Sequence, residues 1–240
     1  MQINREFQSA NFNARPKGTV IDILLLHYTG MKTGQEALTR LCDTPAQVSA
    51  HYLVEEDGRV FQMVEEENRA WHAGLASWKG ETDINSCSIG IEIVNPGHEW
   101  GYRPFPGPQM KALIALCKDI LSRHAIPPQR VLAHSDVAPE RKEDPGEFFD
   151  WMALQKEGIG LYPISPDNSR GIQAGNFLDK LVTYGYWLDP KMPESASTTA
   201  AITAFQRHFR PSNLNGLIDT ECCQILSNLH SQLDAQNNPT

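Results

Sequence analysis

The chain has no apolar run long enough to cross a membrane. Its longest candidate, Val20–Leu26, is short and contains Asp22, whereas a membrane-spanning helix needs roughly 20 apolar residues. This run therefore predicts a buried strand. The first residues, Met1–Glu6, also lack the cationic start and apolar core of a secretory signal, so the sequence favours a cytoplasmic location.

Clusters of positive charge are also lacking. The chain has 21 Lys and Arg against 29 Asp and Glu, a formal net charge of −8, and no Lys/Arg run. Binding to nucleic acid regardless of sequence depends on neutralising phosphates, and binding to a membrane surface depends on a polybasic patch. We therefore expect neither nucleic acid nor membrane as a partner.

Paired cysteines of the CxxC type do not occur, which excludes a thiolate zinc site of that kind. The number of cysteines is odd, and their spacing does not suggest a secreted disulfide framework. Reduced thiols agree with a cytoplasmic location. A periplasmic or envelope location is the alternative if a signal precedes this sequence. The five residues are Cys42, Cys87, Cys117, Cys222 and Cys223.

Short apolar strands alternate with amphipathic helices over the first two-thirds of the chain. This alternation predicts an α/β fold with a mixed central sheet flanked by helices. Asp57-Gly58 between two apolar runs predicts a β-hairpin. The expected strands are Val20–Leu26, Ser49–Val54, Arg59–Val64, Ser88–Val94 and Val131–Ala133, and the expected helices are Gln35–Leu41 and Gln109–His124.

The last third predicts a small all-α domain. Gly, Pro, Ser and Asn become frequent around Gly158–Ser169, which indicates a linker. We place the first domain at 1–157, the linker at 158–170 and a three-helix domain at 171–240, which folds alone or leans on the larger domain. Its expected helices are Ile172–Thr183, Thr198–Phe209 and Thr220–Leu233.

Glu92 lies between isoleucines in the expected strand Ser88–Val94. A carboxylate buried in such a strand is costly unless it is paired or its pKa is tuned for a function. The alternative is an edge strand that points Glu92 at water. The pattern alone leaves both interpretations open.

Two histidines follow apolar strands, and an aspartate follows them in the sequence. His27 and His134 lie at the carboxyl ends of two expected strands, where open α/β sheets collect their sites. Asp144 precedes a Pro-Gly turn that could bring it back beside His134. Two imidazoles, a carboxylate and an open fourth position make a catalytic zinc site. The alternatives are ordinary core or surface histidines and a turn or cap aspartate.

From about His27 to Gly146 the sequence resembles the zinc N-acetylmuramoyl-L-alanine amidases of the amidase-2 type, which are related to peptidoglycan-recognition proteins. Five ordered blocks carry the resemblance: LLLHYTG, SAHYLVEEDGRVFQMV, AWHAG, SIGIEIVNPG and VLAHSDVAPERKEDPG. The resemblance implies that His27, His134 and Asp144 bind Zn²⁺. It also implies that Glu92 acts as general base or proton shuttle and that Lys142 stabilises the oxyanion.

Four more residues in these blocks are expected to contact substrate: His51, Trp71, His72 and Asn95. Trp71 could offer a flat apolar surface to a sugar ring, with core packing as its alternative. For His51 the sequence leaves a catalytic, a substrate-contact and a structural role open. Asn95 could hydrogen-bond the peptide stem.

The C-terminal third resembles the three-helix peptidoglycan-binding domain appended to wall hydrolases. The segments LVTYGYWLD, AITAFQRHF and GLIDTECCQIL carry this resemblance. The alternative is a helical appendage that only stabilises the first domain.

Together the resemblances imply zinc-dependent hydrolysis of the amide bond between N-acetylmuramic acid, or its 1,6-anhydro form, and L-alanine. The substrate would be peptidoglycan or muropeptides, and we expect a monomer. The alternative is a non-catalytic peptidoglycan-recognition protein, but such a protein should have lost a metal ligand, and all three are present.

Overall fold

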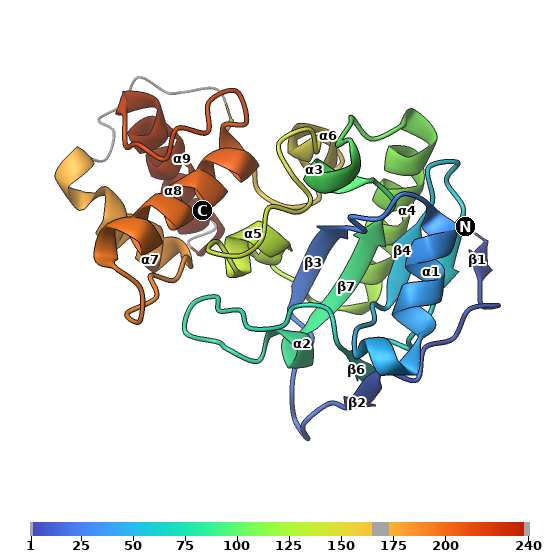
Figure 1. Cartoon of the computed structure of the whole chain (residues 1–240). Helices are drawn as coiled ribbons and strands as arrows, with labels where there is room; N and C mark the ends of the chain where they lie inside the picture. Colours follow the sequence, from blue (N-terminus) through green and yellow to red (C-terminus); the bar gives the residue numbers. More distant parts are fainter. Residues whose placement is uncertain (1, 165–172, 238–240) are drawn as a thin grey trace.

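A six-stranded sheet forms the centre of the computed structural model, which describes residues 2–164 and 173–237 (Figure 1). Only the neighbours β4 and β5 are antiparallel, and the other paired strands are parallel, so the sheet is mixed as predicted. The strand order is β1 (Ile3–Asn4), β5 (Val60–Gln62), β4 (Tyr52–Val54), β7 (Ser88–Ile93), β3 (Ile23–Tyr28) and β8 (Val131–Ala133).

Alternate residues of the central strands pack against opposite layers, as a period of two requires. Leu24 and Leu26 of β3 pack in a cluster with α4 (Gly107–Arg123) and α6 (Trp151–Lys156). On the other face, α1 (Gly34–Cys42) packs over β4 and β5. The predicted helices Gln35–Leu41 and Gln109–His124 are confirmed, with ends shifted by one or two residues. The predicted hairpin is also confirmed, although its first strand begins at Tyr52 and not at Ser49.

Short elements connect and flank these layers. A two-stranded antiparallel sheet joins β2 (Phe12–Ala14) to β6 (Asn68–Ala70). The remaining helices of this part are α2 (Ile84–Cys87), α3 (Gly97–Trp100), α5 (His134–Val137) and the 3₁₀ turns Thr44–Ala46 and Pro128–Arg130.

The last third forms three helices, as predicted. They are α7 (Phe177–Tyr184), α8 (Glu194–Phe209) and α9 (Thr220–Asn237), with a 3₁₀ turn at Ala174–Asn176 before α7. Ile172, the expected start of the first helix, lies outside the described residues, as do linker positions 165–170 and the end of the expected domain at 238–240. Within the described ranges no helix is both long enough and apolar enough to cross a bilayer.

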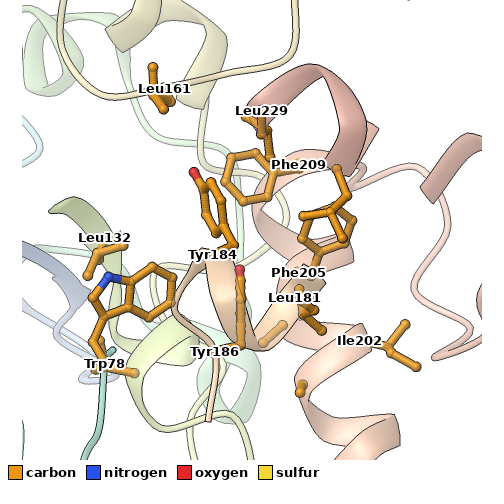
Figure 2. Close-up of a cluster of buried hydrophobic side chains, with 14 of the residues drawn as sticks. Trp78, Leu132, Leu161, Leu181, Tyr184, Tyr186, Ile202, Phe205, Phe209 and Leu229 are labelled. Carbon is orange, nitrogen blue, oxygen red and sulfur yellow. The ribbon is translucent and has the colours of Figure 1, made fainter. Parts of the chain in front are cut away.

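The three helices share a hydrophobic cluster with the sheet domain. Figure 2 shows Trp78 and Leu132 of the larger part facing Tyr184 and Tyr186. The Trp78 and Tyr186 ring centroids lie 5.0 Å apart in an edge-to-face contact. Of the two arrangements that the sequence leaves open, the structure therefore has the helices leaning on the larger domain.

A buried polar cluster reinforces this contact. Asp136 of α5 is fully buried, and its Oδ1 accepts a hydrogen bond of 2.6 Å from the Tyr186 hydroxyl. Its Oδ2 lies 2.7 Å from Nδ1 of His208 in α8. Because a buried carboxylate needs partners, these bonds hold α8 and the loop before it against α5.

Two sequence expectations need correction. The strand predicted from Val20 begins at Ile23, because Val20 is 67% exposed, and it continues through Tyr28, so His27 lies inside the strand. The edge-strand interpretation of Glu92 is wrong, because β7 lies between β4 and β3. At the start of the expected linker, 158–170, Ile159 and Leu161 are buried, each in one of two hydrophobic clusters.

Candidate active site

The three expected metal ligands meet at one point. His27 comes from β3, and His134 is the first residue of α5, directly after β8. Because β3 and β8 are parallel neighbours, their carboxyl ends lie side by side. The Asp144 carbonyl accepts a hydrogen bond from the Ser135 amide, which brings the aspartate back beside His134 as the turn suggested.

The donor atoms of this cluster are close enough to share one ion. Nδ1 of His27 lies 2.9 Å from Nδ1 of His134, and each is 3.0 Å from Oδ2 of Asp144. Donors bound to one tetrahedral zinc at 2.0–2.1 Å lie roughly 3.3 Å apart. The three side chains are buried, and together they match the donor set that zinc prefers.

The protonation states also suit a cation. Burial, together with the nearby His134, lowers the pKa of His27 to about 4. Burial raises the pKa of Asp144, but His134 and His27 outweigh it and hold that pKa well below its ordinary value. Neutral imidazole and ionised carboxylate are the forms that bind metal, so these residues fit the zinc that the sequence implies.

The second ring nitrogen of each histidine has its own partner. Nε2 of His134 lies 2.9 Å from the Ala73 carbonyl oxygen, and Nε2 of His27 lies 3.1 Å from Nδ1 of His72. Burial and the neighbouring His27 lower the pKa of His72 well below its usual value, so its ring is neutral and can accept this bond. Such outer contacts fix the orientation of ligating histidines. His72 therefore contacts His27 at the ring nitrogen that does not face Asp144.

Gly90 of β7 makes room for His72. A Cβ at this position would lie 2.5 Å from ring atoms of His72, so any side chain there would displace the ring. The glycine inside an apolar strand therefore belongs to the site, and the sequence signal for it was its position two residues before Glu92.

Glu92 lies beside His27, to which it is paired in the register of β7 and β3. Its side chain is partly exposed in the pocket, and its Oε2 is buried with no hydrogen-bond partner among the described residues. Burial raises the pKa of Glu92 well above its ordinary value, the charge of Asp144 adds to this, and Lys142 opposes it. A carboxyl group whose pKa is raised holds a proton more readily than an ordinary carboxylate does, so it can take up a proton and pass it on.

A pocket of about 400 Å³ opens over these residues. Of the sequence candidates, it is lined by the three ligands together with Glu92, Lys142, Trp71 and His72. Further lining comes from α1 and from the end of β3 and the loop after it, which no sequence expectation assigned to the site. These additional lining residues include Tyr28, Met31, Arg40 and Leu41.

The structure does not bring His51 and Asn95 to this pocket. Both side chains are fully buried. His51 Nδ1 accepts the Gly90 amide at 3.0 Å, and its Nε2 lies 3.1 Å from the Asn68 carbonyl oxygen. Asn95 donates to the Arg103 carbonyl at 2.7 Å and accepts the Gly97 amide at 3.1 Å. Both therefore hold backbone around the site.

Comparisons with known proteins agree with this arrangement. The family model described as N-acetylmuramoyl-L-alanine amidase matches residues 17–147. The N-acetylmuramoyl-L-alanine amidase AmiD of Escherichia coli (strain K12) is 38% identical, over 84% of this chain and 79% of that one.

Two solved structures extend the match to the C-terminal helices. One is a complex of AmiD from E. coli with the substrate anhydro-N-acetylmuramic acid-L-Ala-D-gamma-Glu-L-Lys, with a TM-score of 0.80, 36% identity and coverage of 91% and 92% of the two chains. The other is AmpDh3 from Pseudomonas aeruginosa in complex with anhydromuramic pentapeptide, with a TM-score of 0.82, 33% identity and coverage of 91% and 94%. The chain therefore belongs to the N-acetylmuramoyl-L-alanine amidase family.

Proposed function

We propose that this chain is a zinc-dependent amidase that hydrolyses the bond between the lactyl group of N-acetylmuramic acid, or of its 1,6-anhydro form, and L-alanine. Its substrates are muropeptides or peptidoglycan. The observation that carries this proposal is the buried cluster of His27, His134 and Asp144, which opens into a pocket beside the unpaired carboxyl of Glu92.

Zinc held by these three residues would polarise the scissile carbonyl and make water more acidic. Glu92 removes the proton of the attacking water as the new carbon–oxygen bond forms. The same carboxyl then gives this proton to the alanine nitrogen as the carbon–nitrogen bond breaks. The raised pKa of Glu92 suits both steps, because the group must gain and lose one proton in each cycle.

Lys142 stabilises the negative charge that develops on the carbonyl oxygen. It lies in the pocket wall two residues before Asp144, so its ammonium can reach the reacting carbonyl. A fixed cation there acts in a site partly screened from water, where its charge has a larger effect.

The other candidate residues have two kinds of role: contact with the substrate, and support of the residues that form the site. We propose that Trp71 packs against the sugar and that His72 keeps His27 oriented, as its 3.1 Å hydrogen bond supports. His51 and Asn95 support the backbone of the site from behind.

For the chain as a whole, we propose a cytoplasmic monomer whose C-terminal helices assist binding of the wall-derived substrate. The five cysteines are unpaired in the part of the chain that the structure describes, which agrees with a reducing compartment. Cell fractionation checks the location, and recovery in the envelope fraction would overturn it.

The test of the proposed function is mass spectrometry of products from defined muropeptides with both sugar forms. We expect release of the intact peptide with a free L-alanine amino group from at least one form, and loss of release after chelation. Intact substrate under all conditions, while the protein binds it, would favour the recognition protein instead.

A further inference from the structure

A second pocket lies beside the first one, with the loop 139–144 and Tyr28 on one side and α8 on the other. Its volume is about 500 Å³, and α8 contributes Ala200, Thr203 and Arg207. Tyr28, Lys142 and Asp144 line both pockets, so the second one continues from the metal centre toward the C-terminal helices. Figure 1 shows α8 beside α5 at this junction.

The α8 wall is held in place before any ligand arrives. His208, next to Arg207, contacts the buried Asp136 at 2.7 Å and stacks on Trp151 with ring centroids 3.7 Å apart. At the other end of α8, the Ser197 hydroxyl donates to Glu140 of the loop at 3.3 Å. A wall fixed on both sides is preorganised, which lowers the cost of binding.

Arg207 is the residue of this wall whose bonding is incomplete. It is only 8% exposed, and its Nε has no hydrogen-bond partner among the described residues. Two carboxylates form ion pairs with it that are longer than a hydrogen bond: Glu143 lies 3.6 Å from Nη2 and Glu147 lies 3.6 Å from Nε. Glu143 has a side chain 53% exposed and can turn away. Because Nε itself is buried, the donors available to an incoming carboxylate are the outer nitrogens of the guanidinium, of which Nη2 faces Glu143.

We propose that the second pocket is a carboxylate subsite in which Arg207 binds a free carboxylate of the peptide stem. This inference rests on the proposed function. In a substrate such as the one in the AmiD complex, the lactyl carboxyl is consumed in the amide bond, so the free carboxylates belong to D-γ-Glu and to the C-terminal residue. The C-terminal helices thereby complete the substrate groove as well as stabilising the fold.

The test compares kcat/KM for a muropeptide with the L-Ala-D-γ-Glu-L-Lys stem and for N-acetylmuramoyl-L-alanine alone. R207Q should lower the ratio of these two values about tenfold, because a charge-assisted hydrogen bond is lost only with the longer substrate. R210Q is the matched control: Arg210 is also buried near the end of α8, but it pairs with Asp219 and Glu221 outside the pocket. It should leave the ratio unchanged.

Amidated substrates identify the carboxylate. For the wild type, amidation of either the D-γ-Glu α-carboxylate or the C-terminal carboxylate should reproduce the R207Q loss, and R207Q should no longer discriminate against that substrate. If the wild-type kcat/KM is the same for both amidated substrates as for the unmodified one, the proposed carboxylate subsite is wrong.

E143Q should change the ratio of the two kcat/KM values in the opposite direction to R207Q. It removes the carboxylate that competes for Arg207, so the ratio should rise. A fall with E143Q and no change with R207Q would show that the pocket takes an ammonium group, which overturns the proposal. Equal losses on both substrates with R207Q would assign it a structural role and also overturn it. If the wild type cleaves neither substrate, the proposed function itself fails.

Discussion

Replacing Tyr186 with phenylalanine removes one hydroxyl from the contact between the sheet domain and the helices. That hydroxyl donates the 2.6 Å bond to Oδ1 of Asp136, a residue with no exposed surface. Leaving a buried acceptor unpaired costs about 1–3 kcal/mol. For a chain of this size, about 2 kcal/mol lowers Tm by roughly 4–8 °C.

Differential scanning calorimetry of the two variants Y186F and Y184F measures this loss. Tyr184 is buried in the same cluster, but its hydroxyl donates no hydrogen bond to Asp136 within the described residues, so Y184F should shift Tm by much less. Equal shifts in the two variants, or no shift in Y186F, would refute the view that Asp136 joins the two parts through this bond.

Three further predictions concern the pocket. E92Q should reduce turnover by roughly 10²–10⁴-fold without loss of bound zinc, measured by kinetics and metal analysis; retained turnover removes Glu92 from proton transfer. In the zinc-free protein E92Q should raise Tm at pH 7. The folded-state pKa of Glu92 is raised by burial and by Asp144, so the stability this group provides is present below an ordinary glutamate pKa of about 4.3 and is lost as pH rises. The Tm of E92Q should therefore approach that of the wild type near pH 4. A Tm difference that stays constant with pH would contradict this prediction. G90A should weaken zinc binding in chelator competition, because its Cβ would strike His72, whereas G107A, with nothing within 4 Å in the described part of the chain, should not.

The meeting of His27, His134 and Asp144 could be predicted because it follows from local patterns. Each histidine ends or follows an apolar run, and parallel strands bring their carboxyl ends to one edge. The sequence could not decide whether Glu92 lies in a central strand or in an edge strand, because its residue pattern suits both positions in a sheet. Strand order depends on contacts far apart in sequence, and only the structure shows β7 between β4 and β3.

The sequence also could not predict the direction in which some side chains point. His51 and Asn95 lie in blocks that carry the family resemblance, yet both point into the protein and hold backbone amides and carbonyls. Conversely, Arg40 of α1 lines the pocket although its helix showed only an ordinary amphipathic pattern. The bond between Asp136 and Tyr186 joins residues 50 positions apart. Each lies in a segment that carries a family resemblance, but no local pattern indicates that the two side chains meet.

The most direct test of the zinc amidase account is a titration of zinc into metal-free protein while release of L-alanyl peptide from an anhydro-muropeptide is followed. The account predicts no release at the start, a linear rise to a plateau at one zinc per chain, and little recovery for H27A at the same zinc concentrations. Full activity without metal, or a plateau unrelated to one equivalent, would contradict it.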